Sequence, residues 1–164
     1  MAFTFTVETG AGVTDANSYC SVAAADAYHE ARLRTEKWQE ATTAERERAL
    51  AMATKLLDQQ MEWRGARVLS REFPAWPRTG MYDKAGILID AATLPTCLVE
   101  ATAELARRLL EDDRIGKSEE RAVSISSGGR SRSYATGFNA PIVPQSITCT
   151  LSHLTVPSRL LRVG

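Results

Sequence analysis

The sequence has 164 residues, of which 44% are apolar and 24% are charged, with 20 basic and 20 acidic side chains. A chain of this length and near-average composition buries a core without disulfides or a structural metal ion, so one globular domain is expected. The isoelectric point near 6.7 is far from the basic values typical of dedicated nucleic-acid-binding domains.

Charge is divided unevenly along the chain. Residues 1–113 contain 13 Lys/Arg and 18 Asp/Glu, a balance of −5, whereas residues 114–164 contain 7 and 2, a balance of +5. We call residues 114–164 the basic segment. Such asymmetry favours an interaction tail, or a tail that neutralises the acidic body or a neighbouring copy of it.

The N-terminal sequence lacks the basic region and continuous apolar stretch of a signal peptide. No apolar run approaches the roughly 20 residues that span a bilayer. The cysteines are widely spaced and odd in number, so they predict buried, reduced thiols rather than a disulfide framework: Cys20, Cys97 and Cys149. We expect assembly in a cytoplasm and no membrane contact.

The first elements are predicted from periodicity and capping. Residues 3–7 alternate apolar and Thr side chains, which predicts a short strand. Ser21 is a good N-cap for a helix over residues 22–33. Thr42 and Glu45 have the spacing of a capping box, which predicts a helix over residues 43–63 with an apolar stripe that includes Ala49, Met52, Ala53, Leu56 and Leu57.

Residues 64–93 predict a long irregular connection, because Pro74 and Pro77 forbid a regular helix there. Loops of this length are often functional. Its apolar residues are expected to cover the helices, with some facing a partner. The candidate interface residues are Phe73, Trp76 and Arg78.

A third main helix is predicted over residues 95–112, with Pro95 in its first turn. Beyond Gly116 the pattern predicts a hairpin arm from residues 121–126 and 132–138, then a strand over 147–151. Pro157 allows a short terminal helix that carries Leu160 and Leu161.

The predicted fold is mainly α. It is a small bundle of three main helices plus a short C-terminal helix, with a long irregular loop and a small β-hairpin or extended C-terminal arm. The predicted division is a helical body over residues 1–113 and an extended arm over residues 114–164.

The chemistry of an enzyme is not visible in the sequence. Catalysis needs convergent groups such as a nucleophile with a base, and metal sites need spaced ligands. His29 and His153 lie at opposite ends of the sequence and share no ligand spacing with the cysteines. Gly128-Gly129 lacks the context of a phosphate loop. We therefore expect no enzymatic activity, no cofactor and no metal ion.

Binding to single-stranded DNA is a more open possibility. Arg130 and Arg132 lie close to Tyr134 and Phe138, and basic residues interleaved with aromatics bind single strands by charge and stacking. The alternative is a flexible basic loop, because four basic residues between positions 117 and 132 make a thin footprint.

Several motifs in a fixed order resemble a known family. They are the segments 7–19 (VETGAGVTDANSY) and 21–28, Trp63-Arg64-Gly65, Trp76-Pro77-Arg78-Thr79-Gly80, Ile89-Asp90, Leu94-Pro95 and residues 101–106. Together they resemble the phage and prophage family labelled "putative DnaT-like single-stranded DNA-binding protein". That family is in turn similar to the head–tail connector, or adaptor, proteins of long-tailed phages. The resemblance covers roughly residues 5–112 and the closing Leu160-Leu161.

The resemblance implies a structural virion protein at the phage neck. Connector proteins of this kind form a ring, typically of twelve copies, that docks on the portal protein, meets other neck or tail-completion proteins and lets double-stranded DNA pass. The alternatives are a DnaT-like single-stranded DNA-binding protein, or another neck or tail-completion protein. The residues expected to face the portal or the DNA are Lys117, Arg121, Arg130, Arg132, Tyr134, Phe138, Leu160 and Leu161.

Overall fold

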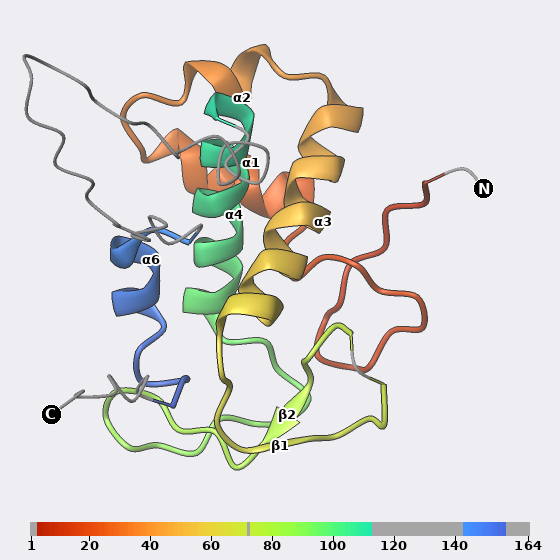
Figure 1. Cartoon of the computed structure of the whole chain (residues 1–164), viewed down its shortest axis with the longest axis vertical. Helices are drawn as coiled ribbons and strands as arrows, with labels where there is room; N and C mark the ends of the chain where they lie inside the picture. The colour runs from red at the N-terminus through yellow and green to blue at the C-terminus, as the bar shows by residue number, and fades with distance from the viewer. Residues whose placement is uncertain (1–2, 72, 113–142, 157–164) are drawn as a thin grey trace, which may run out of the picture.

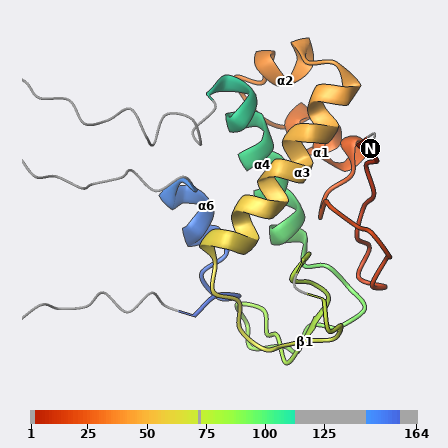
Figure 2. The same cartoon turned by 45° about the vertical axis from the view of Figure 1, so that its right-hand side comes forward.

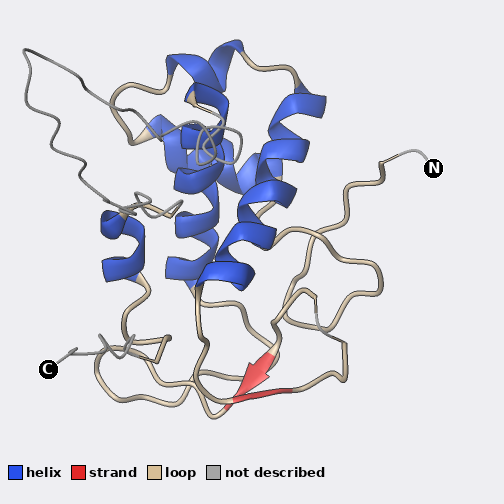
Figure 3. Cartoon of the chain, in the orientation of Figure 1, coloured by secondary structure: helices blue, strands red, loops and turns tan. Residues whose placement is uncertain are grey.

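A computed structural model of the chain describes residues 3–71, 73–112 and 143–156. Over these ranges the protein is mainly helical, which confirms the predicted fold class (Figures 1 and 3). The helices are α1 (Val22–Glu30), α2 (Glu36–Glu40), α3 (Thr43–Gln60), α4 (Thr96–Glu111) and α6 (Gln145–Thr150). Two short strands, β1 (Ala66–Arg67) and β2 (Arg78–Thr79), form an antiparallel ladder.

Helix α4 is the centre of the core. It packs against α1, α2, α3 and α6, and α3 lies beside it in both views (Figures 1 and 2). Leu98 and Leu105 are fully buried. Burial of a leucine side chain contributes about 1.5–3 kcal/mol, so this apolar packing is the main force that holds the helices together.

The predicted caps set where the helices begin. Ser21 Oγ accepts a hydrogen bond from Ala24 N at 3.1 Å. Thr42 and Glu45 form the expected capping box, in which each side chain accepts from the other residue's backbone N–H. Helices α1 and α3 end earlier than predicted, because Ala31 already leaves the helical conformation and Met61 is extended.

Burial along α3 follows the predicted stripe with one exception. Ala49, Ala53, Leu56 and Leu57 are buried, but Met52 is 38% exposed. The prediction also missed α2, because five residues are too few to show a helical period. Its Trp38 is buried, and the indole N–H donates to Asp26 Oδ1 at 2.7 Å.

The strand predicted over residues 3–7 is wrong. Only an isolated bridge joins Val7 to Ser18. A side chain takes the place of a partner strand nearby: Asn17 Oδ1 accepts from Thr6 N at 3.0 Å, and Asn17 Nδ2 donates to Thr4 O at 2.6 Å. The backbone groups are therefore satisfied without a sheet.

The strand predicted over residues 147–151 is also wrong, because this segment is helical. Ile147 and Leu151 are four residues apart and both buried, which is the spacing of one face of a helix. Residues 143–156, placed in the C-terminal arm by the sequence analysis, pack against the body through α4 and through backbone hydrogen bonds to Glu62 and Arg64, just after α3. The predicted hairpin arm and terminal helix lie outside the described residues.

The cysteines do not share one environment. Cys20 is buried as predicted, Cys97 is partly buried, and Cys149 is exposed on α6, so the prediction of three buried thiols is wrong for Cys149. No helix in the described ranges is both long and apolar enough to cross a membrane.

Candidate functional site

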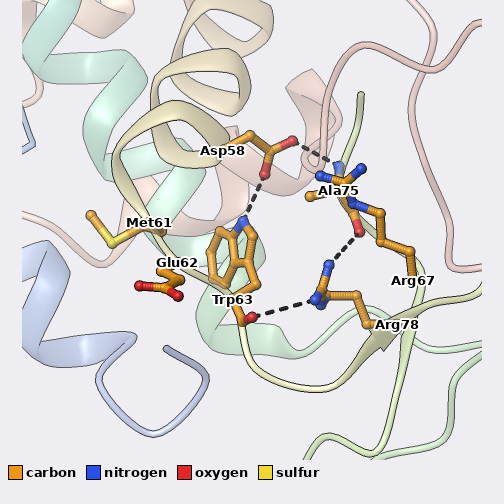
Figure 4. Close-up of a pocket in the computed structure, with 7 residues that line it drawn as sticks. All are labelled: Asp58, Met61, Glu62, Trp63, Arg67, Ala75 and Arg78. Atoms are coloured by element: carbon orange, nitrogen blue, oxygen red, sulfur yellow. Dashed lines mark hydrogen bonds between the residues drawn. The ribbon is translucent and has the colours of Figure 1, made fainter. Parts of the chain in front are cut away.

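A pocket of about 250 Å³ lies where the C-terminal end of α3 meets residues 61–95, which we call the α3–α4 connection. Figure 4 shows its lining side chains. Trp63, Ala75 and Arg78 are buried, whereas Glu62 and Arg67 are exposed at its edge. The lining residues are Asp58, Met61, Glu62, Trp63, Arg67, Ala75 and Arg78.

Asp58 joins three separate parts of the chain at this pocket. Tyr19 Oη donates to both of its carboxylate oxygens, at 2.7 and 2.8 Å. Trp63 Nε1 donates to Oδ1 at 3.0 Å, and Ala75 N donates to Oδ2 at 2.8 Å. A carboxylate that accepts bonds at both oxygens fixes its neighbours in one arrangement.

Burial is the largest influence on the pKa values of Asp58 and Tyr19. It raises the pKa of the Asp58 carboxyl, although the bonds from Ala75, Tyr19 and Trp63 act in the opposite direction. Burial also raises the pKa of Tyr19, with the Asp58 charge as the second cause. Tyr19 therefore remains a hydrogen-bond donor at neutral pH, and its hydroxyl oxygen accepts from Trp76 N at 3.3 Å.

Arg78 holds two segments of the pocket wall together through hydrogen bonds to their backbone carbonyls. Its Nε donates to Arg64 O at 2.7 Å, and Nη1 donates to Ala75 O at 3.3 Å. Its Nη2 donates to Trp63 O at 3.3 Å and Gly65 O at 2.9 Å. Four of the five guanidinium N–H groups are thus used on backbone carbonyls. Burial lowers the pKa of Arg78, and the nearby Arg67 charge lowers it further.

The turn beside Arg78 requires glycine. Gly65 has φ +65°, and a Cβ at this position would lie 2.2 Å from Thr79 O. An L side chain there would be strained and would also collide with the backbone of β2. The close approach of the two short strands therefore depends on this residue.

The three residues predicted in the connection, Phe73, Trp76 and Arg78, lie in different environments in the structure. Arg78 lines the pocket. Trp76 is buried behind it and packs edge-on against Trp63, with ring centroids 6.0 Å apart. Phe73 is 37% exposed and does not line the pocket.

Sequence reasoning did not select Asp58, Trp63 or Arg67. Asp58 looks like an ordinary polar residue near the end of an amphipathic helix, and its partners are up to 39 residues away. An acidic residue just before the helix end, where it opposes the helix dipole, was the one available sign of a special role. The predicted residues of the basic segment, Lys117 to Phe138 and Leu160-Leu161, lie outside the described residues.

A second polar contact links α4 to the segment after α6. Cys97 Sγ lies 3.7 Å from His153 Nε2, which sequence spacing did not predict. Burial raises the pKa of Cys97 and lowers that of His153. Both changes favour neutral groups, so the pair does not have the thiolate and imidazolium character of an activated nucleophile. Within the described ranges, no group of three or more potential ligands could hold a metal ion.

A family model described as "Putative DnaT-like ssDNA binding protein" matches residues 3–158. The chain belongs to this family. The match to this DnaT-like family extends beyond the 5–112 range suggested by the motifs and includes most of the basic segment. Its description names the single-stranded DNA binding given above as an alternative, and does not mention a head–tail connector. No curated protein and no solved structure matches the chain.

Three of the motifs that resembled the DnaT-like family meet in space. Tyr19 ends the 7–19 segment, Trp63 begins Trp63-Arg64-Gly65, and Trp76 and Arg78 belong to the motif that ends at Gly80. All four lie around Asp58 and its pocket. In this chain, these separated motifs therefore build one structural unit.

Proposed function

We propose that the protein binds single-stranded DNA without catalysing a reaction, and that the basic segment supplies much of the binding. The observation that carries this proposal is the family match over residues 3–158, which takes in most of the basic segment. Phosphate neutralisation by Lys and Arg is the principal source of affinity for nucleic acids of any sequence. Arg130 and Arg132, with Tyr134 and Phe138 nearby, have the composition of a stacking and charge site.

The helical body has a separate role in this proposal. It presents the basic segment from a rigid core, because residues 143–156 are anchored on α4 and on Glu62 and Arg64 after α3. The body itself has more acidic than basic residues, so it does not attract the sugar–phosphate backbone over its whole surface. Binding is therefore expected to be local and strongly dependent on salt.

The test is fluorescence anisotropy of the full chain with a labelled oligothymidylate of about 20 nucleotides, longer than the site of one typical binding fold. Micromolar or tighter binding that weakens steeply between about 50 and about 200 mM salt is expected. Replacing Arg130 and Arg132 by Ala should reduce the slope of log K against log salt by about 1.4. The control replaces Arg48 and Lys55, two exposed basic residues of α3, by Ala. Absence of binding at low salt, or equal effects of the two double variants, contradicts the proposal.

A specific surface feature favours a second candidate function, the head–tail connector subunit. Tyr82, Ile87 and Leu88 are 54%, 65% and 60% exposed in the α3–α4 connection. Neighbouring exposed apolar residues are typical of a surface that binds protein. In this alternative, copies assemble into a ring that docks on a portal protein and surrounds double-stranded DNA.

Light scattering coupled to gel filtration distinguishes this alternative. A ring subunit gives a large, discrete oligomer, or enters one when a portal protein is added, and Leu88→Ser reduces its assembly. Ala85→Ser, at an exposed position in the same turn, is the matched control. A monomer that neither assembles nor binds portal protein contradicts the connector candidate.

A further inference from the structure

Two arginines face each other across the short β-ladder. The register places Arg67 directly opposite Arg78. Like charges at opposed positions of an antiparallel pair destabilise it. The effect is visible at Arg78, whose pKa is lowered first by burial and then by the charge of Arg67. We call Arg67 and Arg78 the arginine pair.

Within the part of the chain that the structure describes, neither member of the arginine pair has a carboxylate within ion-pair distance. Five other arginines do: Arg32, Arg46, Arg71, Arg107 and Arg108. The charge of Asp58 acts on both members of the pair, but its two oxygens already accept bonds from Tyr19, Trp63 and Ala75. Two cations at one pocket are therefore left without a direct counter-ion.

The arginine pair retains donors for an anion. Arg67 is exposed, and its one hydrogen bond within the described residues is a long contact of 3.5 Å from Nη1 to Arg71 O. Arg78 keeps one N–H of Nη1 after its four bonds to carbonyls. The pocket has a volume of about 250 Å³, which leaves space for a group of the size of phosphate.

The second acidic residue of the lining restricts where an anion can lie. Glu62 is exposed and lies across Trp63 from Arg67, beside Met61 (Figure 4). Its charge repels an anion from that side of the pocket. The Asp58 carboxylate lies between the Trp63 indole and Ala75 (Figure 4), so both carboxylates direct an anion to the guanidinium groups of the arginine pair.

We propose that the arginine pair forms a subsite for one phosphate group of single-stranded DNA, with the Trp63 indole beside it. This inference rests on the proposed DNA-binding function and adds a contact on the body to those of the basic segment. The guanidinium donors suit a phosphate oxygen, because charge-assisted hydrogen bonds to phosphate are short and strong. A bound phosphate would also relieve the repulsion across the ladder.

The test is a ¹H–¹⁵N NMR titration of the full chain, read at the three tryptophan indole N–H signals. The Trp63 signal is assigned by its loss in Trp63→Phe, and Trp38 serves as an internal reference because it bonds Asp26 away from the pocket. The probes are thymidine 5′-monophosphate, inorganic phosphate and thymidine. The variants are Arg67→Ala and its control Arg48→Ala, both at exposed positions.

A saturable shift of the Trp63 signal is expected with thymidine 5′-monophosphate and with inorganic phosphate, but not with thymidine. Arg67→Ala should abolish this shift, and Arg48→Ala should keep it. An unchanged Trp63 signal in the folded wild-type protein overturns the subsite. A shift of the same size in Arg67→Ala overturns it as well.

The oligothymidylate experiment separates this inference from the proposed function. Arg67→Ala should lower the salt slope by about 0.7 more than Arg48→Ala does. If the oligonucleotide binds but Trp63 does not respond to phosphate, the subsite is wrong and DNA binding stands. If Trp63 responds to phosphate but no oligonucleotide binds, the phosphate subsite stands and DNA is excluded as its ligand.

Discussion

The helical bundle and the α3–α4 connection are both well packed, but they are held by different forces. In the bundle, the fully buried side chains are mostly apolar, such as Leu50, Leu98 and Leu105. The connection is instead fixed by polar groups: its own Arg78 and Asp58, at the end of α3, each bind several groups from other parts of the chain. Apolar burial is non-directional, whereas hydrogen bonds require defined distances and angles.

This difference explains why the connection is ordered although it has little regular secondary structure. The backbone groups of an irregular segment need partners, and here side chains supply them. Glu8 does the same for the N-terminal loop, where it accepts from Gly10 N at 2.9 Å and Gly12 N at 2.8 Å and pairs with Arg71. Changes in the bundle should lower global stability, and changes in the connection should first affect local order.

The largest effect is expected from Leu105→Ala at the centre of α4. Leu105 is fully buried, so its truncation removes apolar contacts and leaves a cavity. The free energy of unfolding should fall by about 3–5 kcal/mol. Urea denaturation followed by circular dichroism measures it. A loss below about 1 kcal/mol would mean that α4 is not the centre of the core.

Arg78→Lys should have the next largest effect. A lysine ammonium lacks the planar fork and cannot reach carbonyls on both sides of the pocket. Several buried carbonyls lose their donor, at a cost of about 2–3 kcal/mol. Hydrogen exchange should quicken in residues 63–79 before it quickens in α3 or α4. Equal acceleration of both regions would argue against a separate polar anchoring of the connection.

Gly65→Ala should cost more than Gly86→Ala, although both glycines have positive φ. Each substitution carries the strain of a left-handed residue, about 1–2 kcal/mol. A Cβ at Gly65 also meets Thr79 O, whereas a Cβ at Gly86 has nothing within 4 Å. Thermal unfolding of the two variants measures the difference. Identical melting temperatures would show that the β1–β2 contact contributes nothing.

The smallest effects concern pH, with opposite signs at the two ends of α3. Burial raises the pKa of Asp58 above its ordinary 3.8, so the stability it contributes is full below that pH and is lost as pH rises through the folded-state pKa. The bond from Thr42 N lowers the pKa of Glu45 below 4.5, so its contribution is present above that pH and is lost as pH falls through the folded-state pKa.

Urea denaturation from about pH 3 to about pH 7 tests these signs with Asp58→Asn and Glu45→Gln. The stability of the wild type relative to Asp58→Asn should decrease as pH rises. Its stability relative to Glu45→Gln should increase over the same range. Parallel pH dependence in both comparisons would contradict the contrast between a buried and a capping carboxylate.

The features that depend on near neighbours could be predicted from the residues alone. The N-cap at Ser21, the capping box at Thr42 and Glu45, and the apolar stripes of α3 and α4 all follow from residues within a few positions of one another. The irregular nature of the connection followed from Pro74 and Pro77, for the same local reason.

The features that join separate parts of the chain could not be predicted, because they arise from tertiary packing. Residues 145–150 form a helix that buries Ile147 against the body. Asp58 accepts hydrogen bonds from Tyr19 and Ala75, which belong to other parts of the chain. The fold also sets Arg67 opposite Arg78, although they are far apart in the chain. Such pairings depend on how the whole backbone folds back on itself, and no local pattern of residue types encodes them.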